Sequence, residues 1–125
     1  MSGKPVLALS DLAQFTGTEQ WFRHGLNRKC LYTEGVRFVA ESAGAYWLID
    51  VIASAQFIGR VREETFQVWH LVVNGAGGIV TCDDGGKDGA RPFVVYSQDL
   101  DFTDFPLPEI KFYCCDGVVM LPTEY

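Results

Sequence analysis

The segment formed by residues 64–74, ETFQVWHLVVN, constrains the fold of this 125-residue chain more than any other stretch. It is rich in β-branched and aromatic residues, and it is too short and irregular for an amphipathic helix, so it predicts a β-strand. Side chains alternate between the two faces of a strand, and here both sets are largely apolar. We therefore expect this strand to lie in the centre of a sheet.

The residues that follow predict more strands of the same sheet. Residues 79–82 and 92–97 indicate two strands joined by a loop rich in glycine and aspartate. Residues 110–121, IKFYCCDGVVML, indicate a closing hairpin, because the Asp116-Gly117 pair suits a type I′ turn. The second half of the chain therefore predicts an antiparallel sheet.

Two helices are predicted in the first half of the chain. Thr16 and Glu19 form a capping box in the sequence TGTE, which predicts a helix over residues 17–24. Residues 44–56, GAYWLIDVIASAQ, predict a second and largely apolar helix that begins at a glycine.

Between these two helices, the segment VRFVAE at residues 36–41 alternates in a way that favours a strand, while a helix stays open. Leu31 and Tyr32 precede it, and Gly35 permits a tight turn between the two pieces. We interpret the whole as a short hairpin.

These elements together predict one α+β domain over residues 1–125, with residues 1–5 as a loose N-terminus. The expected architecture is an antiparallel β-sheet of about 4–6 strands with the two N-terminal-half helices packed on one face. A hydrophobic content of 48% supplies enough apolar side chains for a core, and it argues against a disordered chain.

Charge is distributed unevenly along the chain, whose formal net charge is -6. Residues 1–62 carry seven Lys and Arg against five acids, which gives +2, and residues 63–125 carry three against eleven, which gives -8. Nucleic-acid affinity depends on clustered cations, so direct nucleic-acid binding by the second half is disfavoured. A protein partner with a basic surface would suit it better.

Compartment and cofactors are constrained by what the sequence lacks. No apolar run approaches the roughly 18 residues that span a bilayer, so we expect a cytoplasmic protein that does not bind membranes. The four cysteines contain no CxxC pair, so we expect reduced thiols and no metal centre. The glycine-rich stretches match no phosphate-binding motif, and we expect no cofactor.

Six pieces of the chain carry a resemblance to a known family: FTGTEQWFRH, YTEGV, AYWLIDVIAS, FQVW, DFPLPEIKFY and GVVMLPTEY. They resemble a family of small bacterial proteins known as a domain of unknown function, over about Leu12 to Tyr125. The resemblance implies occurrence in bacterial, plasmid and phage genomes, and it assigns no activity, ligand or catalytic residue. It favours an accessory protein of a mobile element, which binds something without converting it.

Asp50 raises the main question about a site, because it is the single formal charge in the apolar helix. A buried carboxylate needs a partner, and we expect Asp50 to pair with Arg23 or Arg37 at the edge of the core. The alternative is a ligand-binding or weakly enzymatic pocket, since a histidine needs an orienting carboxylate to act as a base. That pocket would be lined by His24, Tyr32, Tyr46 and Asp50.

We assign no catalytic residue from the sequence, and whether the protein is an enzyme stays open, with a non-catalytic role preferred. Cys30 lies beside Arg28 and Lys29, which is the kind of neighbourhood that a cysteine nucleophile requires. A small buried thiol next to a surface loop explains the same residues equally well.

An acidic stretch near the C-terminus is the most suggestive surface. Carboxylates alternate there with large apolar side chains, a mixture that could steer and anchor a basic protein. The predicted partner-binding residues are Asp99, Asp101, Phe102, Asp104, Phe105 and Glu109. Alternatively, the phenylalanines cap the sheet and the acids are simply solvated. A homo-oligomer formed through exposed aromatic residues also stays open.

Overall fold

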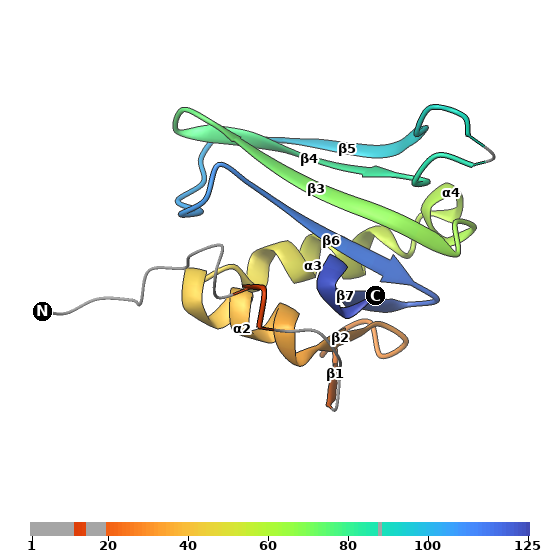
Figure 1. Ribbon diagram of the computed structural model, residues 1–125, viewed down its shortest axis with the longest axis horizontal. Helices are drawn as coiled ribbons and strands as arrows, with labels where there is room; N and C mark the ends of the chain where they lie inside the picture. Colours follow the sequence, from red (N-terminus) through yellow and green to blue (C-terminus); the bar gives the residue numbers. More distant parts are fainter. Residues whose placement is uncertain (1–11, 15–19, 88) are drawn as a thin grey trace, which may run out of the picture.

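The structure is a computed structural model that describes residues 12–14, 20–87 and 89–125. In these ranges seven strands form one sheet in the order β1-β2-β7-β6-β3-β4-β5, and every pairing is antiparallel except that of β2 with β7. The elements in chain order are β1 Trp21–Arg23, β2 Leu31–Thr33, α2 Glu34–Ala43, α3 Tyr46–Ala55, α4 Gly59–Arg62, β3 Phe66–Asn74, β4 Gly77–Asp83, β5 Val94–Leu100, β6 Glu109–Cys115, β7 Val118–Met120 and the 3-10 helix η1 Pro122–Glu124. Figure 1 shows this arrangement.

The predicted central strand is confirmed. β3 lies between β4 and β6, with Trp69 opposite Cys82 on one side and Phe112 on the other. The hairpin of β6 and β7 is also confirmed, and Asp116 and Gly117 both have the positive φ that a type I′ turn requires, 50° and 85°.

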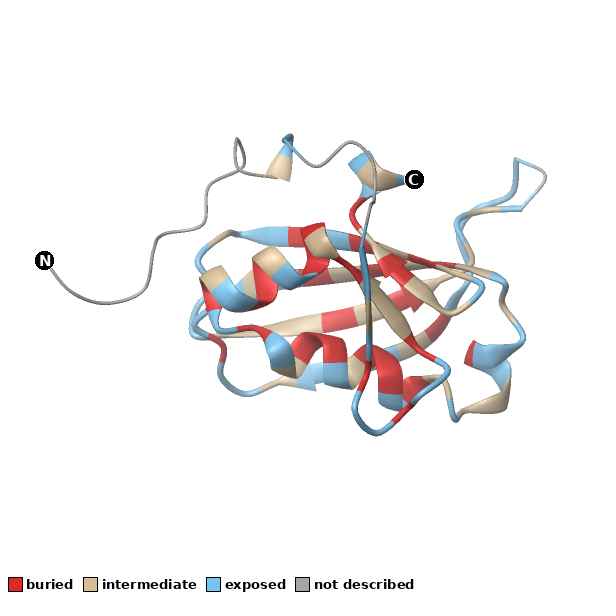
Figure 2. Ribbon diagram, turned by 90° about the horizontal axis from the view of Figure 1, so that it is seen from below, coloured by how far each residue is buried: buried red, intermediate tan, exposed pale blue. Residues whose placement is uncertain are grey.

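Helices α2 and α3 cover one face of the sheet, so the predicted α+β class is confirmed, with seven strands instead of four to six. Figure 2 shows the two helices side by side across the sheet, with their buried residues towards it. Along β3 the buried residues are Gln67, Trp69 and Leu71, which lie on the helix side. Gln56 at the end of α3 and Gln67 hydrogen-bond through their side chains at 2.8 Å.

The helix predicted over residues 17–24 is wrong at its C-terminal end. Residues 21–23 form β1, in which Trp21 lies opposite Thr33 and Phe22 opposite Tyr32. The capping box itself lies among residues 15–19, outside the described part of the chain. Pairing with β2 and the packing of Phe22 on Tyr32, with ring centroids 5.7 Å apart, replace the local preference for a helix.

The short hairpin predicted around Gly35 is also wrong, because residues 34–43 form helix α2. Thr33 caps this helix, and its hydroxyl accepts a hydrogen bond from the amide of Val36 at 3.3 Å. Its buried residues Val36, Val39, Ala40 and Ala43 have helical spacing. The helix ends at Gly44, whose φ of 63° is left-handed.

Candidate functional site

One hollow brings together all four residues that were predicted as ligand-binding. His24 comes directly after β1, Tyr32 lies in β2, and Tyr46 and Asp50 lie one helical turn apart on α3. Gly25, Leu26 and Ile49 complete the lining of a cavity of about 220 Å³. The hollow therefore lies between the β1–β2 turn and the N-terminal half of α3.

His24 and Asp50 form the polar centre of this hollow. The Nε2 atom of His24 lies 2.8 Å from Oδ1 of Asp50. On the other side of the ring, Nδ1 accepts hydrogen bonds from the backbone amides of Leu26 at 3.2 Å and Asn27 at 3.0 Å. An acceptor nitrogen carries no hydrogen, so the hydrogen of the imidazole lies on Nε2 and is donated to Asp50.

This geometry determines what the pair can do. A histidine that acts as a general base needs one free acceptor nitrogen next to the substrate. Here Nδ1 is occupied by two backbone donors and Nε2–H points at Asp50. The histidine is 8% exposed, whereas the side chain of Asp50 is 66% exposed. Asp50 is therefore the member of the pair that can meet a ligand.

Asp50 does not pair with an arginine as expected. Arg37 donates from Nε to Glu41 at 2.7 Å, and its guanidinium lies 4.5 Å from the centre of the Phe22 ring. Arg23 donates to the backbone oxygen of Arg28. The predicted pairing was wrong because both arginines have partners next to them, while the β1–β2 turn brings His24 onto α3.

Asn27 holds the turn in this position, and the sequence analysis missed it. Its Nδ2 donates to the backbone oxygen of Ala53 at 2.9 Å, and its Oδ1 accepts from the amide of Lys29 at 3.2 Å. Asn27 is buried, and its bond to Ala53 is shielded from water. An asparagine in a polar turn is a common sequence signal, but nothing in the sequence indicates that this one bonds to a distant helix.

The second set of predicted residues, the acidic stretch, is divided by the fold. Asp99 lies in β5, Glu109 begins β6, and the connection between the two strands carries Asp101, Phe102 and Asp104. These five residues are exposed, and Phe102 is 71% exposed. We call them the acidic surface.

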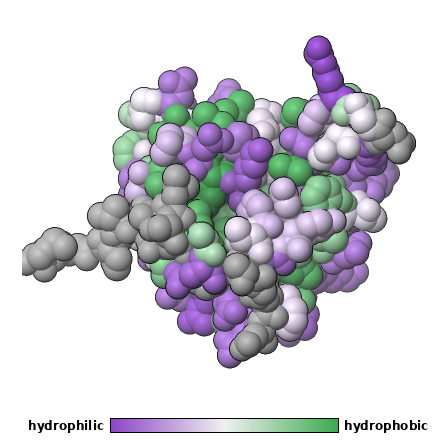
Figure 3. All heavy atoms as spheres, viewed as in Figure 1, coloured by the Kyte–Doolittle hydropathy of each residue, from purple (hydrophilic) through white to green (hydrophobic). Residues whose placement is uncertain are grey.

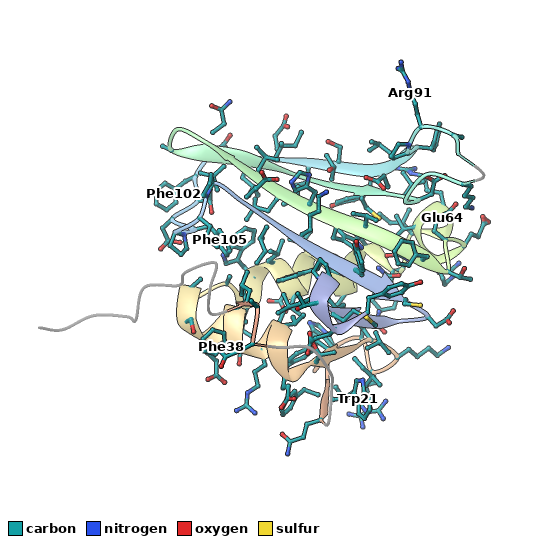
Figure 4. All side chains as sticks on the ribbon, in the orientation of Figure 1. Trp21, Phe38, Glu64, Arg91, Phe102 and Phe105 are labelled. Atoms are coloured by element: carbon teal, nitrogen blue, oxygen red, sulfur yellow. The ribbon has the colours of Figure 1, made fainter. Side chains whose placement is uncertain are left out.

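Phe105, in contrast, is only 6% exposed and belongs to the hydrophobic core. Figure 4 shows Phe102 at the outer edge of the molecule and Phe105 closer to the helices. Burial thus removes Phe105 from the surface that a partner could contact. Within the same stretch, Glu109 accepts a hydrogen bond from Nε2 of His70 at 2.5 Å.

A second and more apolar hollow adjoins the acidic surface. Its cavity volume is about 410 Å³, and it begins at Pro108 and Glu109. The lining residues are Leu12, Pro108, Glu109, Ile110, Lys111, Leu121, Pro122 and Thr123. Figure 3 shows hydrophobic and hydrophilic residues interleaved on this side of the molecule.

Asp84 holds the glycine-rich β4–β5 loop. Oδ1 of Asp84 accepts from the amides of Gly86 and Phe93, both at 3.0 Å. These backbone donors, that of Phe93 first, lower the pKa of Asp84 below its ordinary value. Among the described residues, no three His, Cys, Asp or Glu side chains group as metal ligands, and no helix could span a membrane.

Fold and site together define a small α+β protein with a histidine–carboxylate hollow between the β1–β2 turn and α3 and an acidic surface at the β5–β6 connection. The chain belongs to the family of unknown function DUF6876, which matches residues 7–125. No curated protein and no solved structure matches the chain.

Proposed function

We propose that this protein is a small non-catalytic binding protein that uses the acidic surface to contact a basic partner protein. The observation that carries the proposal is the exposure of four carboxylates on β5, β6 and their connection, which also carries the exposed aromatic side chain of Phe102. A group of negatively charged carboxylates raises the rate of encounter with a basic surface, and a large apolar side chain supplies contact area once the two surfaces meet.

The apolar hollow next to Glu109 supports the same function. A cavity of about 410 Å³ that begins at one end of the acidic surface can receive an apolar side chain of the partner. Binding sites of this kind combine a buried apolar anchor with a charged rim. Because Glu109 belongs to both, the acidic surface and this hollow would meet at Glu109 in the contact with a partner.

We further propose where the protein acts and which class of protein it binds. The protein would act in the cytoplasm, where its four free cysteines stay reduced. As an accessory protein of a mobile element, it would bind a nucleic-acid-binding protein, because the basic surface of such a partner is shaped for phosphates that the carboxylates imitate.

Affinity capture from the native host, with nuclease present, tests this function. We expect a stoichiometric protein that is released as the salt concentration rises from about 0.1 to 1 M, over which the screening length falls from roughly 10 to 3 Å. A triple variant, Asp99→Asn with Asp101→Asn and Glu109→Gln, should lose the partner. A control with the same change of charge, Glu34→Gln with Glu63→Gln and Asp116→Asn, should keep it.

Phe102 has its own matched control. Phe102→Ser should weaken capture, while Phe93→Ser should not, since both rings are similarly exposed, 71% and 69%, and only Phe102 belongs to the acidic surface. A partner that survives high salt and the triple variant would refute the proposal. A concentration-dependent mass with no second protein would instead indicate a homo-oligomer.

A second candidate function is small-molecule binding in the hollow around His24 and Asp50. The observation that favours it is that His24, Tyr32, Tyr46 and Asp50 line one cavity. The engaged nitrogens of His24 count against general-base chemistry there, so this candidate is a binding site and not a catalytic one.

A further inference from the structure

We propose that the hollow between the β1–β2 turn and α3 binds a small organic cation, a primary or methylated ammonium group, with Asp50 as its charge partner and Tyr32 and Tyr46 as its aromatic wall. This inference rests on the second candidate function and names its ligand class, and it does not depend on the acidic surface. It rests on the charge, the lining and the size of the hollow.

The charge of the hollow comes from Asp50. Seven of the described residues line the hollow, and with His24 in the Nε2–H form, Asp50 is the only one of these seven that carries a formal charge. A ring that was protonated on Nδ1 would present a third donor to the amides of Leu26 and Asn27. The imidazole therefore adds no positive charge to offset the carboxylate, and the hollow favours a cation over an anion.

The carboxylate is also available to a ligand. Its Oδ1 accepts from His24, and within the described ranges no hydrogen bond engages Oδ2. The bond to His24 fixes the orientation of the carboxylate, so the second oxygen is directed without further loss of side-chain entropy. The two arginines that could have neutralised Asp50, Arg23 and Arg37, are engaged elsewhere.

The aromatic wall distinguishes an ammonium group from a metal ion. Calcium and magnesium need six or more oxygen ligands, and the described lining of this hollow offers one carboxylate. An organic cation is instead attracted to the faces of aromatic rings and packs against them with its carbon atoms. Arg37 already lies over Phe22 in this way, and Phe22 packs against Tyr32.

Both tyrosines are held by neighbours. The ring of Tyr32 packs on Phe22, and the hydroxyl of Tyr46 donates to Oε1 of Glu41 at 3.2 Å. Glu41 in turn accepts from Arg37, so the ring of Tyr46 is positioned by a chain of two hydrogen bonds. A wall that is fixed before binding loses little entropy when a ligand arrives.

Size limits the ligand. The cavity volume of about 220 Å³ is several times the roughly 30 Å³ that one water molecule occupies in the liquid. It lies below the roughly 300–1,000 Å³ of sites for drug-sized molecules. A quaternary ammonium head with two or three further carbon atoms is of the right order.

Choline and its neutral isostere, 3,3-dimethylbutan-1-ol, are the matched probes, because they share a shape and differ in charge. Titrations of the full chain followed by amide NMR should show saturable shifts at Gly25, Leu26 and Ile49 with choline and with n-butylammonium, and not with the isostere. Equal shifts with the isostere, or no shifts at these amides with either cation, would overturn the proposal.

Asp50→Asn is the decisive variant, because the amide oxygen can still accept from His24 Nε2 while the charge is lost. We expect its affinity for choline to fall at least about tenfold. Glu63→Gln removes one exposed carboxylate elsewhere and should leave choline binding unchanged. A well-dispersed spectrum of Asp50→Asn shows that the fold is intact, and undiminished binding by that folded variant would refute the role of Asp50.

The same ammonium chemistry can come from a free amine or from a lysine side chain of another protein. A short peptide with one trimethyl-lysine separates these sources. Much tighter binding of the peptide than of choline would assign the cation to a protein, and equal binding would assign it to a free amine. Because the triple variant of the acidic surface retains Asp50, it should bind choline normally even if the proposed protein partner does not exist.

Discussion

Strands β3 and β6 pair through seven residue pairs, and so do β3 and β4, whereas β1 and β2 share three pairs and β2 and β7 two. The long ladders satisfy their backbone groups through regular hydrogen bonds, and β3 and β4 are joined by a short turn. The region of β1, β2 and α2 has too few ladder bonds for this, and side chains from distant parts of the chain complete it.

Three side chains carry these distant bonds. Asn27 joins the β1–β2 turn to α3, His24 joins the same turn to Asp50, and Glu124 joins the C-terminus to the start of α2. One polar side chain therefore contributes more to stability where the backbone ladder is short. Matched substitutions in the two regions should therefore differ in their effect on the free energy of unfolding.

The largest difference is expected at Glu124. Its Oε1 accepts from the hydroxyl of Thr33 at 2.6 Å and the amide of Leu121 at 2.9 Å, and its Oε2 accepts from the amide of Gly35 at 3.3 Å. Glu124→Ala leaves these donors, including that of the buried Thr33, without an acceptor. We expect the free energy of unfolding, measured by urea denaturation, to fall by about 2–3 kcal/mol.

Glu109→Ala is the matched change in the ladder region, where the carboxylate meets His70 at the surface. It should cost less than about 1 kcal/mol. Equal losses for the two variants would contradict the distinction between the regions, and Glu124→Gln should fall between them, since the amide retains one acceptor oxygen.

A smaller loss is expected at Asn27. Asn27→Ala removes the bond to the backbone oxygen of Ala53, which then keeps only the bond from the amide of Gln56, and it leaves the amide of Lys29 without its acceptor. We therefore expect a loss of about 1–2 kcal/mol. Gln98→Ala removes a hydrogen bond from Tyr96, two residues away on the same strand, and should change stability by less than about 0.5 kcal/mol. Thermal unfolding of both variants at one protein concentration measures the difference, and a reversed order would refute it.

For backbone conformation we expect the larger effect in the β6–β7 hairpin and the smaller one in the region of β1, β2 and α2. Gly117 has a φ of 85°, and a Cβ there would lie 3.0 Å from the backbone oxygen of Lys29. Gly117→Ala should therefore cost about 1 kcal/mol. Gly25 lies in the side-chain-held region, and a Cβ there would meet nothing within 4 Å. Gly25→Ala should be close to neutral in the same chemical unfolding measurement, and a loss as large as that of Gly117→Ala would contradict the expected difference between the two glycines.

The smallest effect concerns thiol chemistry and leaves stability unchanged. Burial raises the pKa of Cys30 to about 11 and that of Cys114 to about 12, and it also raises the pKa of Cys82. A raised pKa lowers the fraction of reactive thiolate at a given pH. We expect iodoacetamide at neutral pH to label Cys115, which is only partly buried, before the other three. Mass spectrometry of the peptides measures the order, and early labelling of Cys114 would contradict it.

Local pattern was sufficient for much of the fold. The strand at residues 64–74, the apolar helix now seen as α3 and the turn at Asp116 and Gly117 depend on neighbours in the sequence, and the structure confirms all three. Residues 21–23 were misassigned because their strand conformation depends on pairing with β2. Residues 36–41 were misassigned although the Thr33 cap and the helical spacing of the buried residues of α2 are local signals, because their alternation also fits a strand.

The candidate site shows the same division. His24, Tyr32, Tyr46 and Asp50 were predicted as one group because a histidine needs a carboxylate and helical spacing aligns Tyr46 with Asp50. The partner of Asp50 was misjudged, Asn27 was missed, and Phe105 was placed on a surface that it does not reach. Each of these depends on which side chains meet across the fold.

The sequence by itself determined the class of fold, the central strand, the apolar helix and the acidic character of the second half, because periodicity, turn chemistry and charge are local properties. Only the tertiary structure decided that Asp50 meets His24 and that residues 34–43 form a helix whose first turn is bonded to Glu124, near the C-terminus of the chain. The physical reason lies in the sequence separation of the bonded residues. His24 and Asp50 are 26 positions apart, and Gly35 and Glu124 are 89 positions apart. Hydrogen bonds between such distant residues form only once the chain has folded, and no local pattern encodes them.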